Sequence, residues 1–136
     1  MKSVVILDDD VIRIEKMEKT INEFFPEYTF VHFCDSNSII EWLDNNFENV
    51  VLISLDHDLD VEGQTKEPGT GRDVADYLHT KPPYCPVIIH STNHFGREGM
   101  KYTLLDSGWQ VKMVLPTPDY SWIKTDWGSR VKELIF

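Results

Sequence analysis

The chain has 136 residues, 41% of them hydrophobic, which is enough for one ordinary core, and we expect residues 1–136 to form a single domain. Its formal net charge of −10 excludes a surface that binds nucleic acid non-specifically, because such binding needs many Lys and Arg contacts to phosphates. No apolar run approaches the ~20 residues of a membrane helix or resembles a signal peptide. Cys34 and Cys85 are far apart, without CxxC spacing, so we expect a cytoplasmic protein without membrane attachment.

Apolar, β-branched runs alternate with amphipathic stretches along the chain. The expected strands span residues 3–7, 29–33, 50–55, 86–90 and 110–115. The expected helices span residues 11–25, 38–47, 71–79, 97–108 and 121–136. Strands that alternate with helices predict βαβ units, and therefore an α/β fold with a five-stranded, doubly wound parallel sheet and helices on both faces.

Several residues mark the ends of these helices. Asp10, and Asp35 or Ser36, precede expected helices as N-caps, and Gly108 follows the fourth helix. The loop 58–71 is polar and longer than about 12 residues, a length that is typical of functional loops. The tryptophans are expected to pack in the core or at its rim: Trp42, Trp109, Trp122 and Trp127.

Polar side chains follow three of the expected strands at the point where each strand ends. They are Asp8, Asp9 and Asp10 after the first strand, Asp56, His57, Asp58 and Asp60 after the third, and His90, Ser91, Thr92, Asn93 and His94 after the fourth. In an open parallel sheet, ligands bind outside the carboxyl ends of the strands. The sequence therefore predicts a site at this edge.

The carboxylates of this edge indicate a metal. Clustered carboxylates raise one another's pKa unless a cation or a proton lies among them, and their hard oxygens favour Mg²⁺, Mn²⁺ or Ca²⁺. The alternative is that Asp8, Asp9 and Asp10 merely cap the following helix. For Asp10 taken singly, capping is the favoured interpretation.

Two histidines and one helix start are open to two interpretations. Extended geometry would point His57 away from its neighbours Asp56 and Asp58, as a packed structural residue, and His90 ends a buried strand. Alternatively, both histidines serve as acid–base groups near neutral pH. Thr70 and Gly71 precede a helix whose first N–H groups suit an anion such as phosphate, although the GK[ST] of a P-loop is lacking.

The pattern resembles a two-component receiver domain over nearly the whole chain. The matching features are an apolar strand with "DDD", an aspartate that ends the third strand, and a small hydroxyl residue after the fourth. The resemblance implies the strand order 2-1-3-4-5. It also implies Asp8 and Asp9 as the acidic pair for Mg²⁺, Asp56 as the phosphoacceptor and Ser91 as the switch residue.

One departure points to a narrower family. Receivers carry a Lys before a Pro at the end of the fifth strand, where this chain reads "VKMVLPTP" and has Leu115 or Thr117. The segments "LDDD" with Arg13, "SLDHDL", "TGRDVADYL" and "HSTNHFGREGM" are together similar to the cyclic-phosphate processing receiver domain. This resemblance implies a receiver scaffold that acts as an enzyme on cyclic phosphates of nucleotides or RNA ends.

The resulting hypothesis is a metal-assisted phosphoesterase with Mg²⁺ or Mn²⁺, whose substrate is a small cyclic nucleotide or a cyclic-phosphate-ended RNA. The expected metal ligands are Asp8, Asp9, Asp56 and Asp58, the catalytic residues His57, His90, Asp56, Ser91 and Asn93, and the phosphate-binding residues Arg13, Thr70 and Gly71. Glu67 and the loop 58–71 are expected to form a lid.

Three alternatives remain from the sequence. The first is a non-enzymatic, receiver-like signalling or nucleotide-binding module with Asp56 as the phosphoacceptor. The second is a haloacid-dehalogenase-type phosphatase with Asp56 as nucleophile and Asp58 as acid, but its motif normally follows the first strand rather than the third. The third is a metal-free two-histidine phosphodiesterase, which needs two copies of the "HST" form found once here. The oligomeric state does not follow from the sequence.

Overall fold

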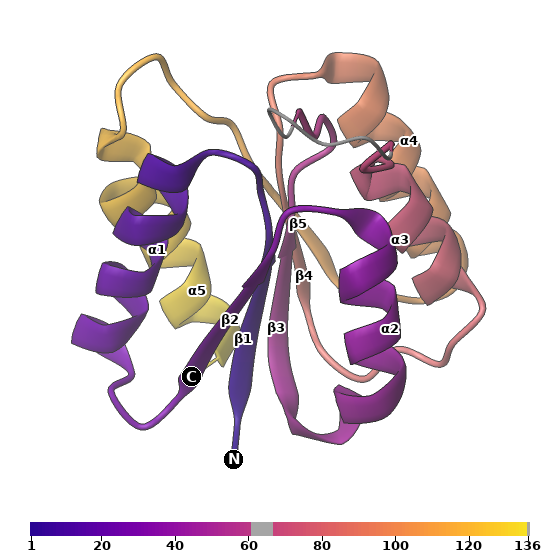
Figure 1. Cartoon of the computed structure of the whole chain (residues 1–136), viewed down its shortest axis with the longest axis horizontal. Coiled ribbons are helices and arrows are strands. Elements are labelled where there is room, and N and C mark those ends of the chain that lie inside the picture. The colour runs from indigo at the N-terminus through magenta and orange to yellow at the C-terminus, as the bar shows by residue number, and fades with distance from the viewer. Residues whose placement is uncertain (61–66, 136) are drawn as a thin grey trace.

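The computed structural model describes residues 1–60 and 67–135. Its centre is a sheet of five parallel strands in the order β2-β1-β3-β4-β5, which confirms the predicted fold class and strand order (Figure 1). The strands are β1 (Ser3–Leu7), β2 (Thr29–Phe33), β3 (Val50–Leu55), β4 (Val87–His90) and β5 (Val111–Val114).

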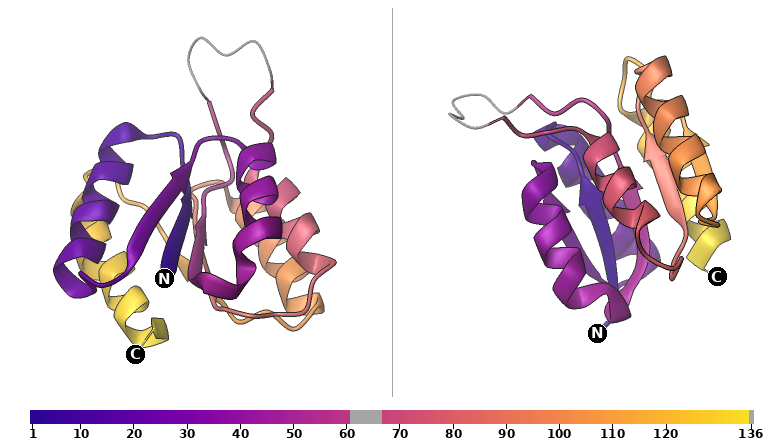
Figure 2. Two further views of the ribbon diagram at one scale, coloured as in Figure 1. Left: turned by 60° about the horizontal axis from the view of Figure 1, so that its bottom comes forward. Right: turned by 90° about the vertical axis from the view of Figure 1, so that its right-hand side faces the viewer.

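Helices cover both faces of the sheet. They are α1 (Val11–Phe24), α2 (Ser36–Asn46), α3 (Gly71–His79), α4 (His94–Asp106) and α5 (Gly128–Ile135). The helices α1 and α5 lie together on one face, and α2, α3 and α4 lie on the other (Figures 1 and 2). No helix in residues 1–60 and 67–135 is long and apolar enough to cross a membrane.

The strand β1 shows why the strands read as continuous apolar runs. Its side chains alternate between two cores: Val5 and Leu7 pack in the core under α2, α3 and α4, whereas Val4 and Ile6 pack in the core under α1 and α5. All four are fully buried. A central strand covered on both faces therefore needs apolar residues at every position.

The helix ends largely follow the capping residues. Asp10 and Asp35 cap α1 and α2 with their side chains, and Gly108 follows α4 with a φ of 88°, which glycine adopts without strain. The predicted start of the fourth helix at residue 97 is wrong. Its start is three residues earlier, because the side chain of Asn93 accepts a hydrogen bond of 2.8 Å from the N–H of Gly96.

The last predicted helix, 121–136, is interrupted. A π-helical turn, Ile123–Trp127, precedes α5, which runs to the last residue that the structure describes. Trp122 and Trp127 at the two ends of this turn are both buried against the sheet, as expected of packing residues.

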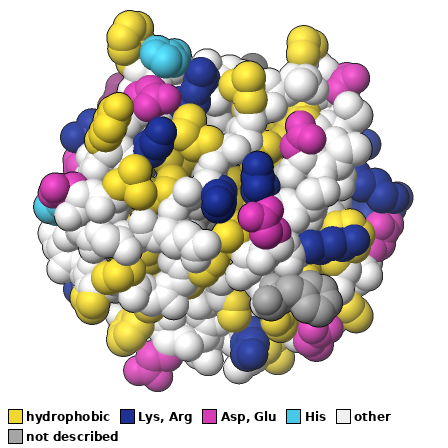
Figure 3. Space-filling view, turned by 180° about the vertical axis from the view of Figure 1, so that it is seen from behind, with side chains coloured by type: hydrophobic (Ala, Val, Ile, Leu, Met, Phe, Trp, Pro, Cys, Tyr) yellow, Lys and Arg dark blue, Asp and Glu magenta, His cyan; other side chains and the backbone are white. Residues whose placement is uncertain are grey.

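The rear surface, over β5 and the helices beside it, is mixed in character. Figure 3 shows hydrophobic side chains there interleaved with charged ones of both signs. The exposed large hydrophobic residues of α4 are Phe95, Tyr102 and Leu105. Exposed apolar side chains among charged ones are common on protein surfaces.

The register of the sheet aligns the ends of the central strands. Leu7 of β1 pairs with Leu55 of β3, and Leu55 pairs with Ile89 of β4. The residues that follow these positions therefore emerge at the same level of one edge, which we call the carboxyl edge.

Candidate functional site

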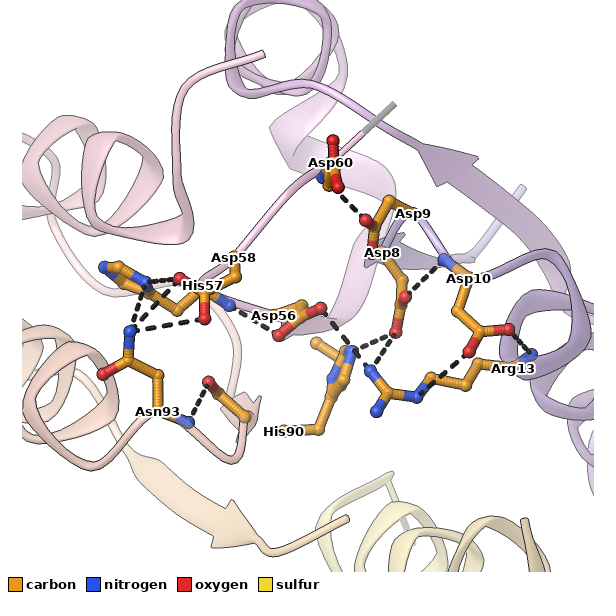
Figure 4. Close-up of polar contacts among 12 residues, drawn as sticks. Asp8, Asp9, Asp10, Arg13, Asp56, His57, Asp58, Asp60, His90 and Asn93 are labelled. Carbon is orange, nitrogen blue, oxygen red and sulfur yellow. Dashed lines mark hydrogen bonds and ion pairs between the residues drawn. The ribbon is translucent and has the colours of Figure 1, made fainter. Parts of the chain in front are cut away.

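Three carboxylates meet at the carboxyl edge, those of Asp8, Asp9 and Asp56 (Figure 4). One oxygen atom from each lies within 4.8 Å of the others. Asp8 and Asp56 are 0% and 6% exposed, and Asp9 is half-buried. Hard oxygen atoms at this spacing suit a Mg²⁺ or Mn²⁺ ion. The structure thus brings together three of the four predicted metal ligands.

These carboxylates differ in pKa. Burial, together with the charge of Asp8, raises the pKa of Asp56 to about 7. Burial also raises the pKa of Asp9, against a hydrogen bond of 2.6 Å from the N–H of Asp60. Burial acts in the same direction on Asp8, but its hydrogen bond to His90 and the charge of that residue hold its pKa below the ordinary value. A cation among these groups would offset the negative charge that burial disfavours.

Arg13 on α1 places a positive charge beside the cluster. Its Nη1 atom lies 3.7 Å from Asp8 Oδ2 and 3.6 Å from Asp56 Oδ2. Its Nε atom lies 3.8 Å from Asp10 Oδ2, and its guanidinium carbon lies 5.6 Å from the centre of the Trp122 ring. The side chain remains 21% exposed. Arg13 is therefore held in place while it stays accessible to an anion.

An open hollow of about 410 Å³ contains these groups. Its lining residues are Asp9, Asp10, Arg13, Asp56, Asp58 and Thr92. Asp10 points its Oδ1 atom at the N–H groups of Ile12 and Arg13, which confirms the capping interpretation. Thr92 is exposed at the hollow, and sequence reasoning assigned it no role.

His90 lies behind the carboxylates rather than in the hollow. It is 0% exposed, with Nε2 at 2.9 Å from Asp8 Oδ2 and Nδ1 at 2.6 Å from Ser54 Oγ. Ser54 in turn accepts a hydrogen bond of 3.0 Å from Trp127 Nε1. With both ring nitrogens engaged and no exposed surface, His90 does not reach a substrate in this arrangement. The geometry instead makes it a support for Asp8.

Sequence reasoning missed Ser54 and Trp127 as members of this hydrogen-bonded chain. The available signal was a hydroxyl residue inside the otherwise apolar run "VVLISL". A buried hydroxyl needs a partner, so Ser54 implied one on a neighbouring strand or helix. The sequence did not identify His90 and Trp127 as those partners.

His57 lies at the other side of the hollow, with its ring directed away from Asp8 and Asp9 (Figure 4). The strand β3 ends at Leu55, so the extended geometry that would separate His57 from Asp58 does not persist. His57 Nδ1 lies 2.7 Å from Asp58 Oδ1. This hydrogen bond lowers the pKa of Asp58. Asp58 is therefore paired with a histidine and lies outside the three-carboxylate cluster.

Asn93 and Ser91 complete this side of the site. Asn93 Nδ2 donates to Asp58 Oδ1 at 3.2 Å and lies 3.4 Å from His57 Nδ1. Ser91 is 1% exposed, and its Oγ accepts the N–H of Asn93 at 3.1 Å. Asn93 thus touches the His57–Asp58 pair, whereas Ser91 holds the turn that leads into α4.

The backbone N–H groups of Thr70 and Gly71 are already engaged, that of Thr70 with Asp73 Oδ2 at 3.0 Å. Thr70 Oγ1 accepts the N–H of Arg72 at 3.2 Å in the cap of α3. The N–H of Gly71 donates to His57 O at 2.9 Å. A Cβ atom on Gly71 would lie 2.0 Å from Asp56 O, so glycine here permits the close approach of α3 to the end of β3. The phosphate-binding prediction for these residues does not agree with this geometry.

The predicted lid falls on a segment of which only part is described. Glu67 is exposed at the start of the described part that leads into α3. Residues 61–66 of the loop 58–71 lie outside the described residues.

Comparisons with known proteins agree with the family resemblance and with the fold. A family model described as "Cyclic-phosphate processing Receiver domain" matches residues 4–106. No curated protein sequence matches the chain significantly.

Solved structures of response regulators are similar in fold. A receiver domain from Rhodospirillum rubrum is 19% identical, with a TM-score of 0.69 over 96% of this chain and 94% of that one. The phosphorylated cyanobacterial phytochrome response regulator RcpA is 17% identical, with a TM-score of 0.75 over 98% and 93%. The Mn²⁺-bound form of the response regulator Rcp1 is 16% identical, with a TM-score of 0.66 over 98% and 91%.

Proposed function

The chain belongs to the cyclic-phosphate processing receiver domain family, and from this premise we propose that it hydrolyses cyclic phosphodiesters of nucleotides or RNA ends with a divalent metal ion. One observation carries the proposal: the Arg13 guanidinium lies within 3.7 Å of two carboxylates of the cluster. The carboxylates, which can bind a cation, and the Arg13 guanidinium, which can bind an anion, thus lie next to each other. This combination suits a phosphate that is bound to a metal ion.

The carboxylates of Asp8, Asp9 and Asp56 would hold the metal ion, and their hard oxygens favour Mg²⁺ or Mn²⁺. When bound, such an ion polarises a phosphoryl oxygen and lowers the pKa of a bound water. Rcp1, a response regulator that shares the fold, has a Mn²⁺-bound form, which supports a divalent metal ion as the ligand. Asp58 is left out of this set because it pairs with His57.

Arg13 and His90 have different roles in this proposal. Arg13 binds the phosphoryl oxygens, since its guanidinium is partly exposed and offers several donors. His90 keeps Asp8 ionised and oriented through their 2.9 Å hydrogen bond. His90 is therefore a positioning residue rather than an acid or base in contact with substrate.

Hydrolysis also needs a proton transfer. The water oxygen bonds to phosphorus, the bond from phosphorus to one ribose oxygen breaks, and that oxygen takes up a proton as the water loses one. Asp58 lines the hollow and forms a 2.7 Å hydrogen bond with His57, so we assign this transfer to the His57–Asp58 pair. Asn93 holds the pair in place.

The test is hydrolysis of 2′,3′-cyclic and 3′,5′-cyclic mononucleotides with Mg²⁺, with Mn²⁺ and with a chelator. We expect metal-dependent release of a phosphomonoester that is lost in Asp56→Asn and in Arg13→Ala. The control is Asp126→Asn, which removes a carboxylate that is exposed on the π-helical turn and leaves the site intact. Full activity of Asp56→Asn would exclude this site, and absence of turnover with these mononucleotides and with an RNA that ends in a 2′,3′-cyclic phosphate, with either metal, would exclude this function.

A second candidate is a signalling receiver that is phosphorylated on Asp56. The observation that favours it is the fold shared with response regulators, together with the position of Asp56 at the end of β3. Against it, Leu115 or Thr117 stands where receivers carry a lysine. Incubation with acetyl phosphate and mass spectrometry decides between them: a hydroxylamine-labile phosphate on Asp56 supports the receiver, and its absence supports the hydrolase.

A further inference from the structure

A second hollow, of about 410 Å³, lies between α1 and the segment Asp119–Lys124. We call it the lysine groove. Its lining includes the side chains of Lys16 and Lys19 from α1, and of Tyr120, Ser121 and Lys124 from the facing segment. That segment runs into the π-helical turn before α5, which Figure 1 shows beside α1. Widened turns of this kind often occur at functional sites.

The groove is positively charged although the protein as a whole is acidic. Lys124 pairs with Glu23 at 3.7 Å. Within residues 1–60 and 67–135, Lys16 and Lys19 form no ion pair. Two exposed ammonium groups thus remain available in the groove.

The acidic residue on the opposite wall, Asp119, is already engaged. Its Oδ1 accepts hydrogen bonds from the hydroxyls of Thr117 at 3.0 Å and of Ser121 at 2.7 Å, and from the N–H of Ser121 at 3.1 Å. These local bonds lower its pKa and hold the carboxylate in its own turn. Asp119 therefore keeps its negative charge, but within the described residues it forms no ion pair with Lys16 or Lys19.

The lysine groove adjoins the acidic hollow, and one hydrogen bond links their walls. Tyr120 from the groove donates a hydrogen bond of 3.2 Å from its hydroxyl to Asp10 Oδ2, and Asp10 lines the hollow. Along α1, Arg13 of the hollow is followed by Lys16 and Lys19 at successive steps of three residues. At a rise of 1.5 Å per residue, this row of cations extends about 9 Å from the site.

We propose that the lysine groove binds the phosphodiester backbone next to the reacting group, so that the preferred substrate is a short single-stranded oligonucleotide that ends in a cyclic phosphate. The inference rests on the proposed function and specifies its substrate. A cyclic mononucleotide carries one phosphate, which Arg13 and the metal ligands would hold. Lys16 and Lys19 then have a role only if further phosphates follow.

The aromatic ring of Tyr120 and the charge of the whole chain narrow the ligand further. Tyr120 packs against the core under α1 and α5 and stays partly exposed. Proteins that bind single strands combine aromatic rings, on which bases stack, with cationic groups that bind the backbone. The net charge of −10 opposes a long duplex, which would extend beyond the groove. A chain of two or three nucleotides beyond the cyclic phosphate fits the reach of Lys16 and Lys19.

The experiment compares two substrates and two double variants. The substrates are a 2′,3′-cyclic mononucleotide and a trinucleotide with a 2′,3′-cyclic end. The variants are Lys16→Ala with Lys19→Ala, and, as a control that removes the same charge elsewhere, Lys2→Ala with Lys101→Ala. We expect the first variant to raise the KM for the trinucleotide, with an increase about sevenfold larger at low salt than at about fourfold higher salt, and to leave the KM for the mononucleotide unchanged. The sevenfold factor follows from a loss of two phosphate contacts, each of which contributes about 0.7 to the salt slope on single strands.

Binding gives a readout that does not need turnover. A fluorescein-labelled trinucleotide 3′-phosphate is titrated at several salt concentrations, and the slope of log Kd against log salt should fall by about 1.4 in the first variant. If no substrate is turned over but this slope change occurs, the groove is supported and the proposed hydrolysis fails. If the mononucleotide is hydrolysed and neither KM nor slope depends on Lys16 and Lys19, hydrolysis stands and the groove is refuted.

Discussion

Asp56 should make the stability of the metal-free protein depend on pH, and the substitution Asp56→Asn should remove most of that dependence. Burial raises the pKa of this carboxyl from 3.8, its ordinary value, to about 7. Between these two values the folded protein binds more protons than the unfolded chain does. The free energy of unfolding therefore falls as the pH rises from about 4 to about 7.

The size of this effect follows from the two pKa values. The full difference corresponds to roughly 4 kcal/mol, of which roughly 3 kcal/mol falls between pH 5 and pH 8. The pKa of Asp8 is lowered in the folded protein. Its contribution to the free energy of unfolding is therefore fully present above the pKa of the unfolded chain and is lost only at more acidic pH, outside this window. Three kcal/mol is a large part of the roughly 5–15 kcal/mol by which domains are stable.

The assay is urea unfolding with a chelator present, at about pH 5 and about pH 8. We expect the wild type to lose at least roughly 3 kcal/mol between the two and Asp56→Asn to lose much less, the remainder coming from Asp9, whose pKa is also raised. Mg²⁺ at about 100 times its Kd should restore about 2.7 kcal/mol to the wild type at the higher pH. Asp58→Asn is the control, because the pKa of Asp58 is lowered rather than raised. Equal pH dependence of wild type and Asp56→Asn would refute the reasoning.

Two further substitutions test the supports of the site. Gly71→Ala should destabilise the protein by about 1–3 kcal/mol, because the new Cβ would meet Asp56 O at 2.0 Å. Gly99→Ala is the control and should cost less, because its Cβ would meet only the flexible end of Arg72. Equal urea midpoints for the two variants would contradict this prediction. Ser54→Ala should destabilise the protein by about 1–3 kcal/mol, because it removes the hydrogen-bond partner of His90 and of the buried Trp127 indole. It should also weaken Mg²⁺ binding, measured by calorimetry. Unchanged stability and affinity would argue against this chain of hydrogen bonds.

The fold was predictable because its signals are local. Asp10 and Asp35 mark where helices begin after strands and Gly108 marks where a helix ends, and the structure has these residues in those roles. The start of α4 is not evident from the sequence, because Asn93 lies in a polar run that the strand end already explains, whereas in the structure its side chain caps the helix. Asn93 both caps α4 and contacts Asp58, and sequence spacing does not distinguish these two roles.

The sequence by itself determined that charged residues follow buried strands, and the rule that parallel strands end at one edge was sufficient to bring Asp8, Asp9 and Asp56 together. The tertiary structure decided which way the histidines face. His90 points inward because its two ring nitrogens form hydrogen bonds with Ser54 and Asp8. These residues are 36 and 82 positions away in the chain, respectively. The direction of a side chain beyond a strand end depends on partners that packing supplies, and local sequence carries no information about them.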